Sequence, residues 1–130
     1  MVKPYDFSKL RKSLTKNIDG LSLGFNDPKD WIGTGSYALN YLISGDYYKG
    51  VPLGKVTMFA GESGSGKSLV VSGNLVRNAQ ELGCFVVMMD SENALDTDWL
   101  EALGVDTSED KLLKINVSMI DSVAKTLSEF

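Results

Sequence analysis

Histidine is absent from this chain of 130 residues, and cysteine occurs once, as Cys84. Without histidine the chain lacks the usual general base at neutral pH and the commonest metal ligand, so carboxylates, lysine and hydroxyl groups must carry any chemistry. A single cysteine excludes a disulfide within the chain and fits a reducing compartment. The longest apolar run, residues 85–89, cannot cross a bilayer, and the start MVKPYDFSKLRK lacks the apolar stretch of a secretory signal. We therefore expect a cytoplasmic chain with no membrane partner.

The overall composition is that of an acidic globular domain. The length suffices for one compact domain with one core, and 43% hydrophobic and 23% charged residues are ordinary for a soluble protein. The net charge of -4 argues against a protein that neutralises nucleic-acid phosphates over its whole surface. A local basic site is compatible with this charge.

The N-terminal part of the sequence predicts two helices joined by an irregular connector. Asp6 is placed to cap the first helix, which Gly20 ends, and its apolar residues recur at helical spacing. These residues are Phe7, Leu10, Leu14 and Ile18. The connector LSLGFNDPKDWIGTG is too rich in glycine and proline to form one regular element. Ser36 begins the second helix and Gly45 ends it.

Strands and helices are predicted to alternate in the rest of the chain. Three apolar, β-rich runs predict strands, namely KVTMFA (55–60), CFVVMMD (84–90) and KLLKINV (111–117). Each of the first two runs is followed by a segment with helical spacing or helical caps. This order predicts an α/β fold with a parallel sheet flanked by helices.

Local signals set the bounds of the helices between and after these strands. A helix over 68–82 ends at Gly83. A second helix runs over 96–103, where Leu95 and Leu100 are spaced as a hydrophobic staple. For the helix over 119–130, the predicted capping box pairs Ser118 with Asp121.

The stretch GESGSGKS lies between a predicted strand and a predicted helix and matches the phosphate-binding (Walker A) pattern G-x-x-x-x-G-K-[ST]. Gly64 and Gly66 let the backbone curl so that N–H groups point at a phosphate, and the helix start adds its positive dipole end. Lys67 would reach the terminal phosphates, and the Ser68 hydroxyl would bind Mg²⁺. The alternative is a surface turn that matches by accident. The predicted nucleotide-binding residues here are Gly61, Glu62, Ser63, Gly64, Ser65, Gly66, Lys67, Ser68 and Leu69.

The acidic end of the run 84–90 has three interpretations. Asp90 ends an apolar strand, as a magnesium-organising aspartate does, but its strand directly follows the phosphate-loop helix. Glu92 is the better candidate for a carboxylate that orients the group attacking the γ-phosphate. The third interpretation is that Asp90 and Glu92 only start a solvated turn.

Three stretches resemble the ATPase core of RecA-type DNA recombinases, most closely the phage UvsX-like branch. They are TGSYALNYLISG, PLGKVTMFAGESGSGKS and FVVMMDSENALDTDWLEALGVD, and the resemblance covers the chain from Ile32 onward. The glycine loop is shared by many families, whereas DSENALD followed by LGVD is more specific. The resemblance implies a RecA-like P-loop NTPase fold, incomplete at the C-terminus, in which 55–60 and 84–90 are not hydrogen-bonded neighbours.

The resemblance also implies roles for individual residues. Glu92 would activate the hydrolytic water, with Lys67 as the second catalytic residue. Asp96 would contact the adenine amino group, and Trp99 would lie against the adenine face, although a tryptophan near several leucines is equally well a core residue. Ser68 stands where threonine is frequent, and Asn93 where bacterial relatives often have histidine.

The family implies two parts and several partners. Residues 1–31 would be an N-terminal helix and linker that contacts the adjacent subunit of a filament, and residues 32–130 the first part of the ATPase core. Cofactors would be ATP and Mg²⁺, and partners single-stranded DNA and further copies of the protein. Because the DNA-binding loops and the magnesium-organising strand follow residue 130 in the family, we expect a fragment that binds nucleotide weakly and hydrolyses ATP undetectably. Its location would be the bacterial cytoplasm, or the infected host if a phage encodes it.

The leading prediction is therefore the ATP-binding portion of a DNA-dependent ATPase that forms filaments on single-stranded DNA and promotes homologous strand exchange in recombination and repair. A P-loop small-molecule kinase is the second prediction, with Asp90 or Glu92 taking the proton of the acceptor hydroxyl. The third is a non-catalytic nucleotide-binding assembly module.

Overall fold

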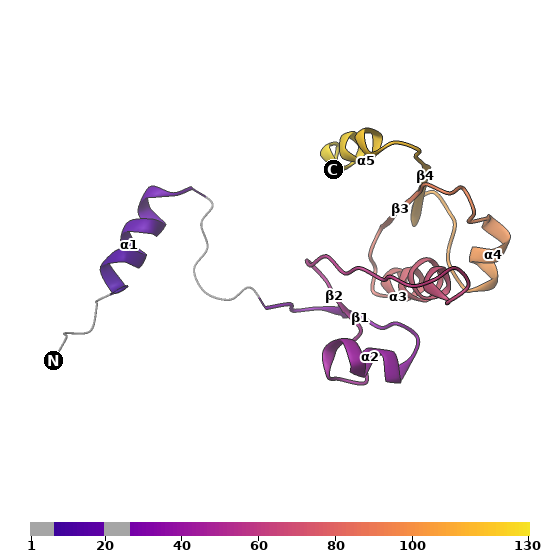
Figure 1. Ribbon diagram of the computed structural model, residues 1–130, viewed down its shortest axis with the longest axis horizontal. Coiled ribbons are helices and arrows are strands. Elements are labelled where there is room, and N and C mark those ends of the chain that lie inside the picture. The colour runs from indigo at the N-terminus through magenta and orange to yellow at the C-terminus, as the bar shows by residue number, and fades with distance from the viewer. Residues whose placement is uncertain (1–6, 20–26) are drawn as a thin grey trace.

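The computed structural model describes residues 7–19 and 27–130, and these form a mixed arrangement of helices and short strands (Figure 1). In chain order the elements are α1 (Phe7–Asn17), β1 (Trp31–Ile32), α2 (Tyr37–Ser44), β2 (Val51–Pro52), the π-helix η1 (Leu69–Leu75), α3 (Val76–Glu81), β3 (Val86–Asp90), α4 (Thr97–Ala102), β4 (Leu112–Asn116) and α5 (Ile120–Ser128). The α/β class predicted from the sequence is confirmed, with a small parallel sheet. None of the described helices is long and apolar enough to span a membrane.

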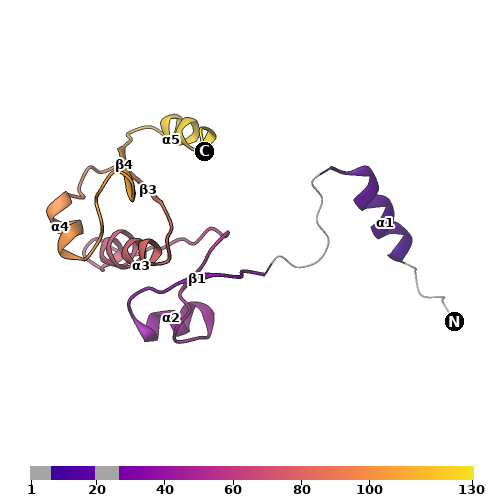
Figure 2. The ribbon, with the colours of Figure 1, turned by 180° about the vertical axis from the view of Figure 1, so that it is seen from behind.

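Helix α1 confirms the first predicted helix, and it stands apart from the other elements in both opposed views (Figures 1 and 2). The apolar residues Phe7, Leu10 and Leu14 of its stripe are exposed, and so is Ile18, which follows the end of the helix. The predicted cap Asp6 and terminator Gly20 lie outside the described residues. A role of α1 in subunit contact stays a prediction.

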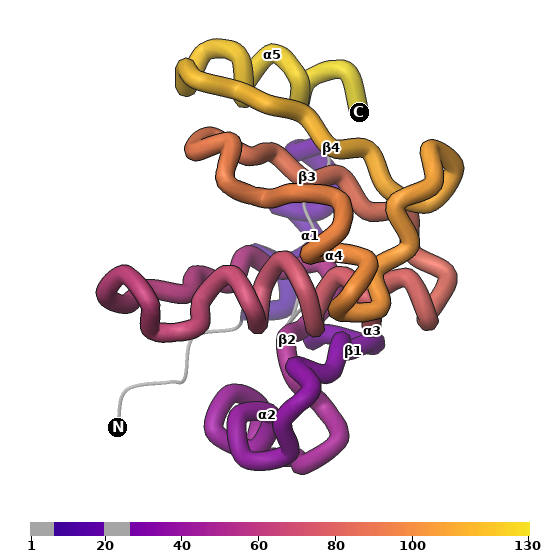
Figure 3. Tube along the Cα trace, turned by 90° about the vertical axis from the view of Figure 1, so that its right-hand side faces the viewer, coloured from indigo at the N-terminus to yellow at the C-terminus, as the bar shows by residue number. Residues whose placement is uncertain are grey.

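The other elements stack in the order α5, the β3–β4 pair, α3, the β1–β2 pair and α2 (Figures 1 and 3). The residues between β1 and β2 confirm the second predicted helix with both of its ends. The Ser36 side chain accepts a hydrogen bond from Leu39 N at 3.3 Å, and Gly45 takes the left-handed conformation at φ 78°. The connector before α2 also forms β1, which pairs antiparallel with β2, and this two-residue strand was not predicted from the sequence.

The core lies between the parallel β3–β4 pair and helices α3 and α4. The pair runs in register from Val86↔Leu112 to Asp90↔Asn116, which confirms the second and third predicted strands. The buried core residues are Val76, Met88, Leu100, Val105 and Leu112, with Val86, Leu95 and Trp99 packed against them. Because Leu95 and Leu100 share this cluster, the hydrophobic staple predicted at the start of α4 is confirmed.

The first predicted strand, over 55–60, is wrong. These residues belong to no helix or strand and pair with no other described segment, and Val56 and Met58 are 99% and 86% exposed. Residues form a β-strand only where backbone hydrogen bonds join them to a neighbouring strand. Here β3 pairs with β4 rather than with this segment. The expectation that 55–60 and 84–90 are not hydrogen-bonded neighbours agrees with this arrangement.

The helix after the glycine loop begins with wider turns than predicted. Residues 69–75 form the π-helix η1, and α3 continues as a regular helix to Glu81. Gly73 is buried here, and a Cβ on it would lie 2.5 Å from Leu103 Cδ1. This glycine therefore allows the helix to pack closely against the end of α4. The predicted terminator Gly83 is confirmed, with φ 84°.

The capping box predicted before the last helix is wrong. Met119 is the N-cap of α5 and makes no side-chain hydrogen bond to the helix. Because the helix begins at Ile120, Ser118 lies one residue too early for its hydroxyl to take the capping position.

Candidate functional site

The glycine loop has the backbone conformation that its sequence predicts. Gly64 and Gly66 take positive φ values of 79° and 93°, a region in which side chains with a Cβ are strained. The N–H of Ser65 donates to the carbonyl of Glu62 at 3.2 Å and closes a turn inside the loop. The curl of the loop is thus set by two glycines and one internal hydrogen bond.

Lys67 and Ser68 sit where the loop enters the helix, and both are exposed. The Lys67 ammonium donates to the carbonyl of Gly61 at 2.6 Å, so it bridges the two ends of the loop. A Cβ on Gly61 would lie 2.7 Å from Ser65 Oγ, so a larger residue at this position would crowd the Ser65 side chain. A phosphate entering the loop would meet an ammonium group held against the first residue of the loop.

A pocket of about 420 Å³ joins the glycine loop to the acidic turn after β3. Its lining residues are Ser63, Gly64, Gly66, Lys67, Ser68, Leu69, Glu92 and Trp99. The structure therefore brings together the loop, the proposed water-activating carboxylate and the aromatic ring, although Ser68 and Glu92 lie 24 positions apart in the sequence. Gly61, Glu62 and Ser65 shape the loop but do not line this pocket.

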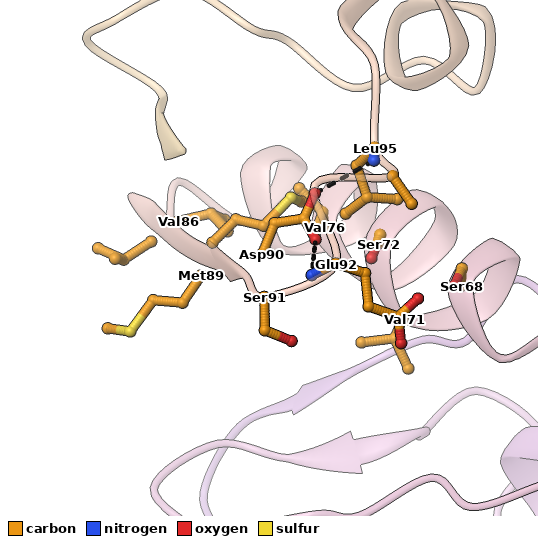
Figure 4. Close-up of a pocket in the computed structure, with 13 residues that line it drawn as sticks. Ser68, Val71, Ser72, Val76, Val86, Met89, Asp90, Ser91, Glu92 and Leu95 are labelled. Atoms are coloured by element: carbon orange, nitrogen blue, oxygen red, sulfur yellow. Dashed lines mark hydrogen bonds between the residues drawn. The ribbon is translucent and has the colours of Figure 1, made fainter. Parts of the chain in front are cut away.

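A second pocket, of about 380 Å³, lies between β3 and the helix that follows the loop (Figure 4). Ser68 and Ser72 line its helix side, and the residues of β3 with Ser91 and Glu92 line the other. The Glu92 side chain extends from the end of β3 toward the helix that carries Ser68 (Figure 4). Glu92 and Ser68 thus line both pockets.

Asp90 is turned away from the loop and into its own turn. It is 7% exposed, and its carboxylate accepts hydrogen bonds from three backbone N–H groups, those of Glu92, Asn93 and Leu95. Burial alone would raise the pKa of this carboxyl, but these N–H groups, that of Leu95 foremost, and the Lys114 ammonium lower it below its ordinary value. Asp90 thus starts a turn, as the third interpretation has it, but its carboxylate is buried rather than solvated.

Asp96 and Trp99 begin helix α4. Asp96 is its N-cap, and its carboxylate accepts the N–H of Trp99 at 2.7 Å. Asp96 does not line the pocket beside the loop, and the adenine contact that the resemblance implies for it stays a prediction. Trp99 packs against the core and also lines the pocket, so both interpretations of this ring fit its position.

The positions of two residues near the site were not predicted from the sequence. Lys114 on β4 lies 3.7 Å from Asp90 Oδ2, a contact that depends on the parallel register of β3 and β4. Asn93 takes a positive φ of 52° without being a glycine. Asparagine tolerates this region better than most residues, which is the one property that could have indicated the turn.

The parallel pair, the helices and the glycine loop that precedes a helix define a mixed α/β chain. A family model described as the RecA N-terminal domain matches residues 11–127, and the chain belongs to this family. Protein RecA of Rhodococcus jostii is 39% identical over 87 residues, and that of Nocardioides sp. is 40% identical over 100 residues. These matches cover 67% and 77% of this chain but 24% and 26% of the relatives. Protein RecA of Acidothermus cellulolyticus is 34% identical over 116 residues, 75% of this chain and 32% of the relative. The chain therefore spans about a quarter to a third of the length of these relatives.

Proposed function

We propose that this chain is the ATP-binding part of a DNA-dependent ATPase that assembles on single-stranded DNA and promotes homologous strand exchange. The observation that carries the proposal is the pocket in which Lys67, Ser68, Glu92 and Trp99 meet. Membership of the RecA family supports it, because this family couples ATP hydrolysis to DNA recombination and repair. We further propose the phage UvsX-like branch of the family, on the resemblance of the three stretches quoted above, of which DSENALD followed by LGVD is more specific than the glycine loop.

Nucleotide binding would use the backbone of the loop first. N–H groups exposed by the curl at Gly64 and Gly66 would surround the β- and γ-phosphates, and Lys67 would exchange its bond to the Gly61 carbonyl for a phosphate oxygen. Ser68 would offer its hydroxyl to Mg²⁺, which supplies a positive charge that binds phosphate oxygens. The pocket fits this use, because Ser68 lines it beside Lys67 and both are exposed.

The base would lie on the other side of the pocket. Trp99 presents a large π-surface there, and its packing against the core would hold the ring in place. Asp96 fixes the start of the helix that carries this ring. We therefore assign Asp96 a supporting part in adenine binding, through its cap, and keep direct contact with the adenine as a prediction.

Hydrolysis would depend on Glu92. Its carboxylate lines the same pocket as Lys67 and Ser68, so a water between them could be oriented toward the γ-phosphate. A general base in this place contributes about 10²- to 10⁴-fold to a rate. Lys67 would stabilise the charge that develops on the phosphate oxygens.

The test compares Glu92→Gln with Glu81→Gln in the protein expressed from its full coding sequence. Glu81 is exposed at the end of α3 and does not line the loop pocket, so its substitution controls for the loss of one carboxylate. We expect Glu92→Gln to lower ATP turnover on single-stranded DNA at least about 100-fold while ATP binding is retained. Turnover equal to that of Glu81→Gln would contradict the proposed role and favour a non-catalytic assembly module. Phosphate transfer to a small acceptor without DNA dependence would favour a kinase.

A further inference from the structure

The turn after β3 is held from inside by one carboxylate. Asp90 Oδ1 accepts the N–H of Glu92 at 3.1 Å and that of Asn93 at 2.9 Å. Its other oxygen, Oδ2, accepts the N–H of Leu95 at 3.1 Å (Figure 4). Both carboxylate oxygens therefore accept hydrogen bonds from the backbone of residues 92–95, and none of these bonds comes from a side chain of the turn.

Two further contacts define how this carboxylate is placed. The Lys114 ammonium on β4 lies 3.7 Å from Oδ2, the oxygen that also binds Leu95. Asn93, whose N–H donates to Oδ1, is the described non-glycine residue with a positive φ. A backbone in that region is strained unless its surroundings determine it, and the hydrogen bond from Asn93 to Asp90 supplies such a constraint.

Glu92 is the residue that this turn presents to the loop pocket. Its backbone N–H is fixed by Asp90, whereas its side chain extends to the helix that carries Ser68 (Figure 4). An exposed glutamate on an unrestrained turn would spread over many positions, and the pocket would hold its carboxylate only part of the time. The position of Glu92 therefore depends on hydrogen bonds that another carboxylate accepts.

We propose that Asp90 is a positioning residue, which fixes the turn over 91–95 and thereby aims Glu92 at the phosphate loop. Asp90 does not touch nucleotide or magnesium in this assignment, because its oxygens already bind backbone N–H groups and face Lys114. The inference rests on the proposed function, since it gives Asp90 a role through the hydrolytic role of Glu92. Its consequence is that loss of the Asp90 carboxylate impairs turnover while nucleotide binding persists.

The variant Asp90→Asn tests this assignment in the protein expressed from its full coding sequence. Asparagine keeps one acceptor oxygen but replaces Oδ2 by an NH₂ group, which cannot accept from Leu95 N and repels Lys114. Asp106→Asn is the matched control, because Asp106 also accepts hydrogen bonds in a turn, from the N–H and hydroxyl of Ser108, and lies outside both pockets beside the loop.

We expect Asp90→Asn to lower kcat about 10- to 100-fold, the range that a misplacement of about 1 Å causes, with KM for ATP changed less than about threefold. In the Glu92→Gln background the same substitution should have no further effect on kcat, because Asp90 acts through Glu92. A kcat equal to that of Asp106→Asn would overturn the inference. An added loss in the Glu92→Gln background would overturn it as well.

Turnover of Glu92→Gln tests the proposed role of Glu92 by itself, and hydrogen exchange tests the role of Asp90 without a variant that could misfold. If Glu92→Gln itself leaves turnover intact, the proposed function fails, whatever Asp90→Asn does. Amide hydrogen exchange in the unsubstituted 130-residue chain needs no variant to fold. We expect the amides of Glu92, Asn93 and Leu95 to be protected, and exchange at the rate of an unstructured chain would show that Asp90 does not hold the turn.

Discussion

Replacing Gly66 by alanine tests whether the curled backbone of the phosphate loop is needed for ATP binding. Gly66 has φ 93°, and a Cβ built on it would meet nothing within 4 Å. The substitution therefore adds no clash, and its cost is the backbone strain of an L-residue in the left-handed region, about 1–2 kcal/mol. The variant chain can escape this strain only by giving up the curl of the loop.

Nucleotide binding must then restore the strained curl. If ATP binds only the curled loop, the strain is subtracted from the binding free energy, and the affinity for ATP and Mg²⁺ falls by about 5- to 30-fold. The assay is a calorimetric or fluorescence titration of the chain with ATP in the presence of Mg²⁺.

Gly54 supplies the matched control. It has φ 74°, a Cβ on it would also meet nothing within 4 Å, and it lies outside the loop pocket. Gly54→Ala should cost the same stability in denaturant unfolding but leave the affinity for ATP unchanged. If Gly66→Ala and Gly54→Ala bind ATP with equal affinity, the curled loop is not the conformation that binds ATP.

Two further predictions concern stability. Leu100 is 1% exposed in the core, so Leu100→Ala should lower the free energy of unfolding by about 2–5 kcal/mol in urea titration, and a loss below about 1 kcal/mol would contradict the core assignment. Acid should also destabilise the fold, because the pKa of Asp90 is lowered by backbone N–H groups against the effect of burial, and that of Asp106 by the Ser108 hydroxyl. Their stabilisation is complete above the unfolded-state pKa of about 3.9 and is lost as the pH falls through the lower folded-state values. Unfolding measured from about pH 6 to about pH 3 checks this, and a free energy of unfolding that does not fall would contradict it.

Features with a local cause could be predicted from the sequence. Ser36 and Gly45 bound α2 through hydrogen bonds within a few residues, and Asp96 caps α4 in the same way. Gly64 and Gly66 were expected at positive φ because the phosphate-binding pattern requires a curl there. Most of the run 84–90 forms the strand β3, from which Met88 joins the core and Val86 packs against it, and its apolar composition is visible without the fold.

Features that depend on distant partners could not be predicted. Residues 55–60 have the composition of a strand, but a strand needs a neighbour, and no other described segment pairs with them. The contact of Lys114 with Asp90 follows from the parallel register, which sequence spacing does not specify. The two oxygens of Asp90 accept hydrogen bonds from the backbone rather than bind a ligand. The sequence of a strand that ends in aspartate does not distinguish these two roles.

Binding of the ATP phosphates by the curled loop and Lys67 can be measured by titrating the protein expressed from its full coding sequence with ATP and Mg²⁺. Lys67→Ala is the variant, and Lys49→Ala, which removes a lysine from the exposed loop after α2, is its control. We expect saturable binding by the unsubstituted protein and by Lys49→Ala, and an affinity lower by at least about tenfold in Lys67→Ala, because a charged hydrogen bond is lost. Equal binding by Lys67→Ala and Lys49→Ala, or no binding by the unsubstituted protein, would show that the loop and Lys67 do not bind the phosphates.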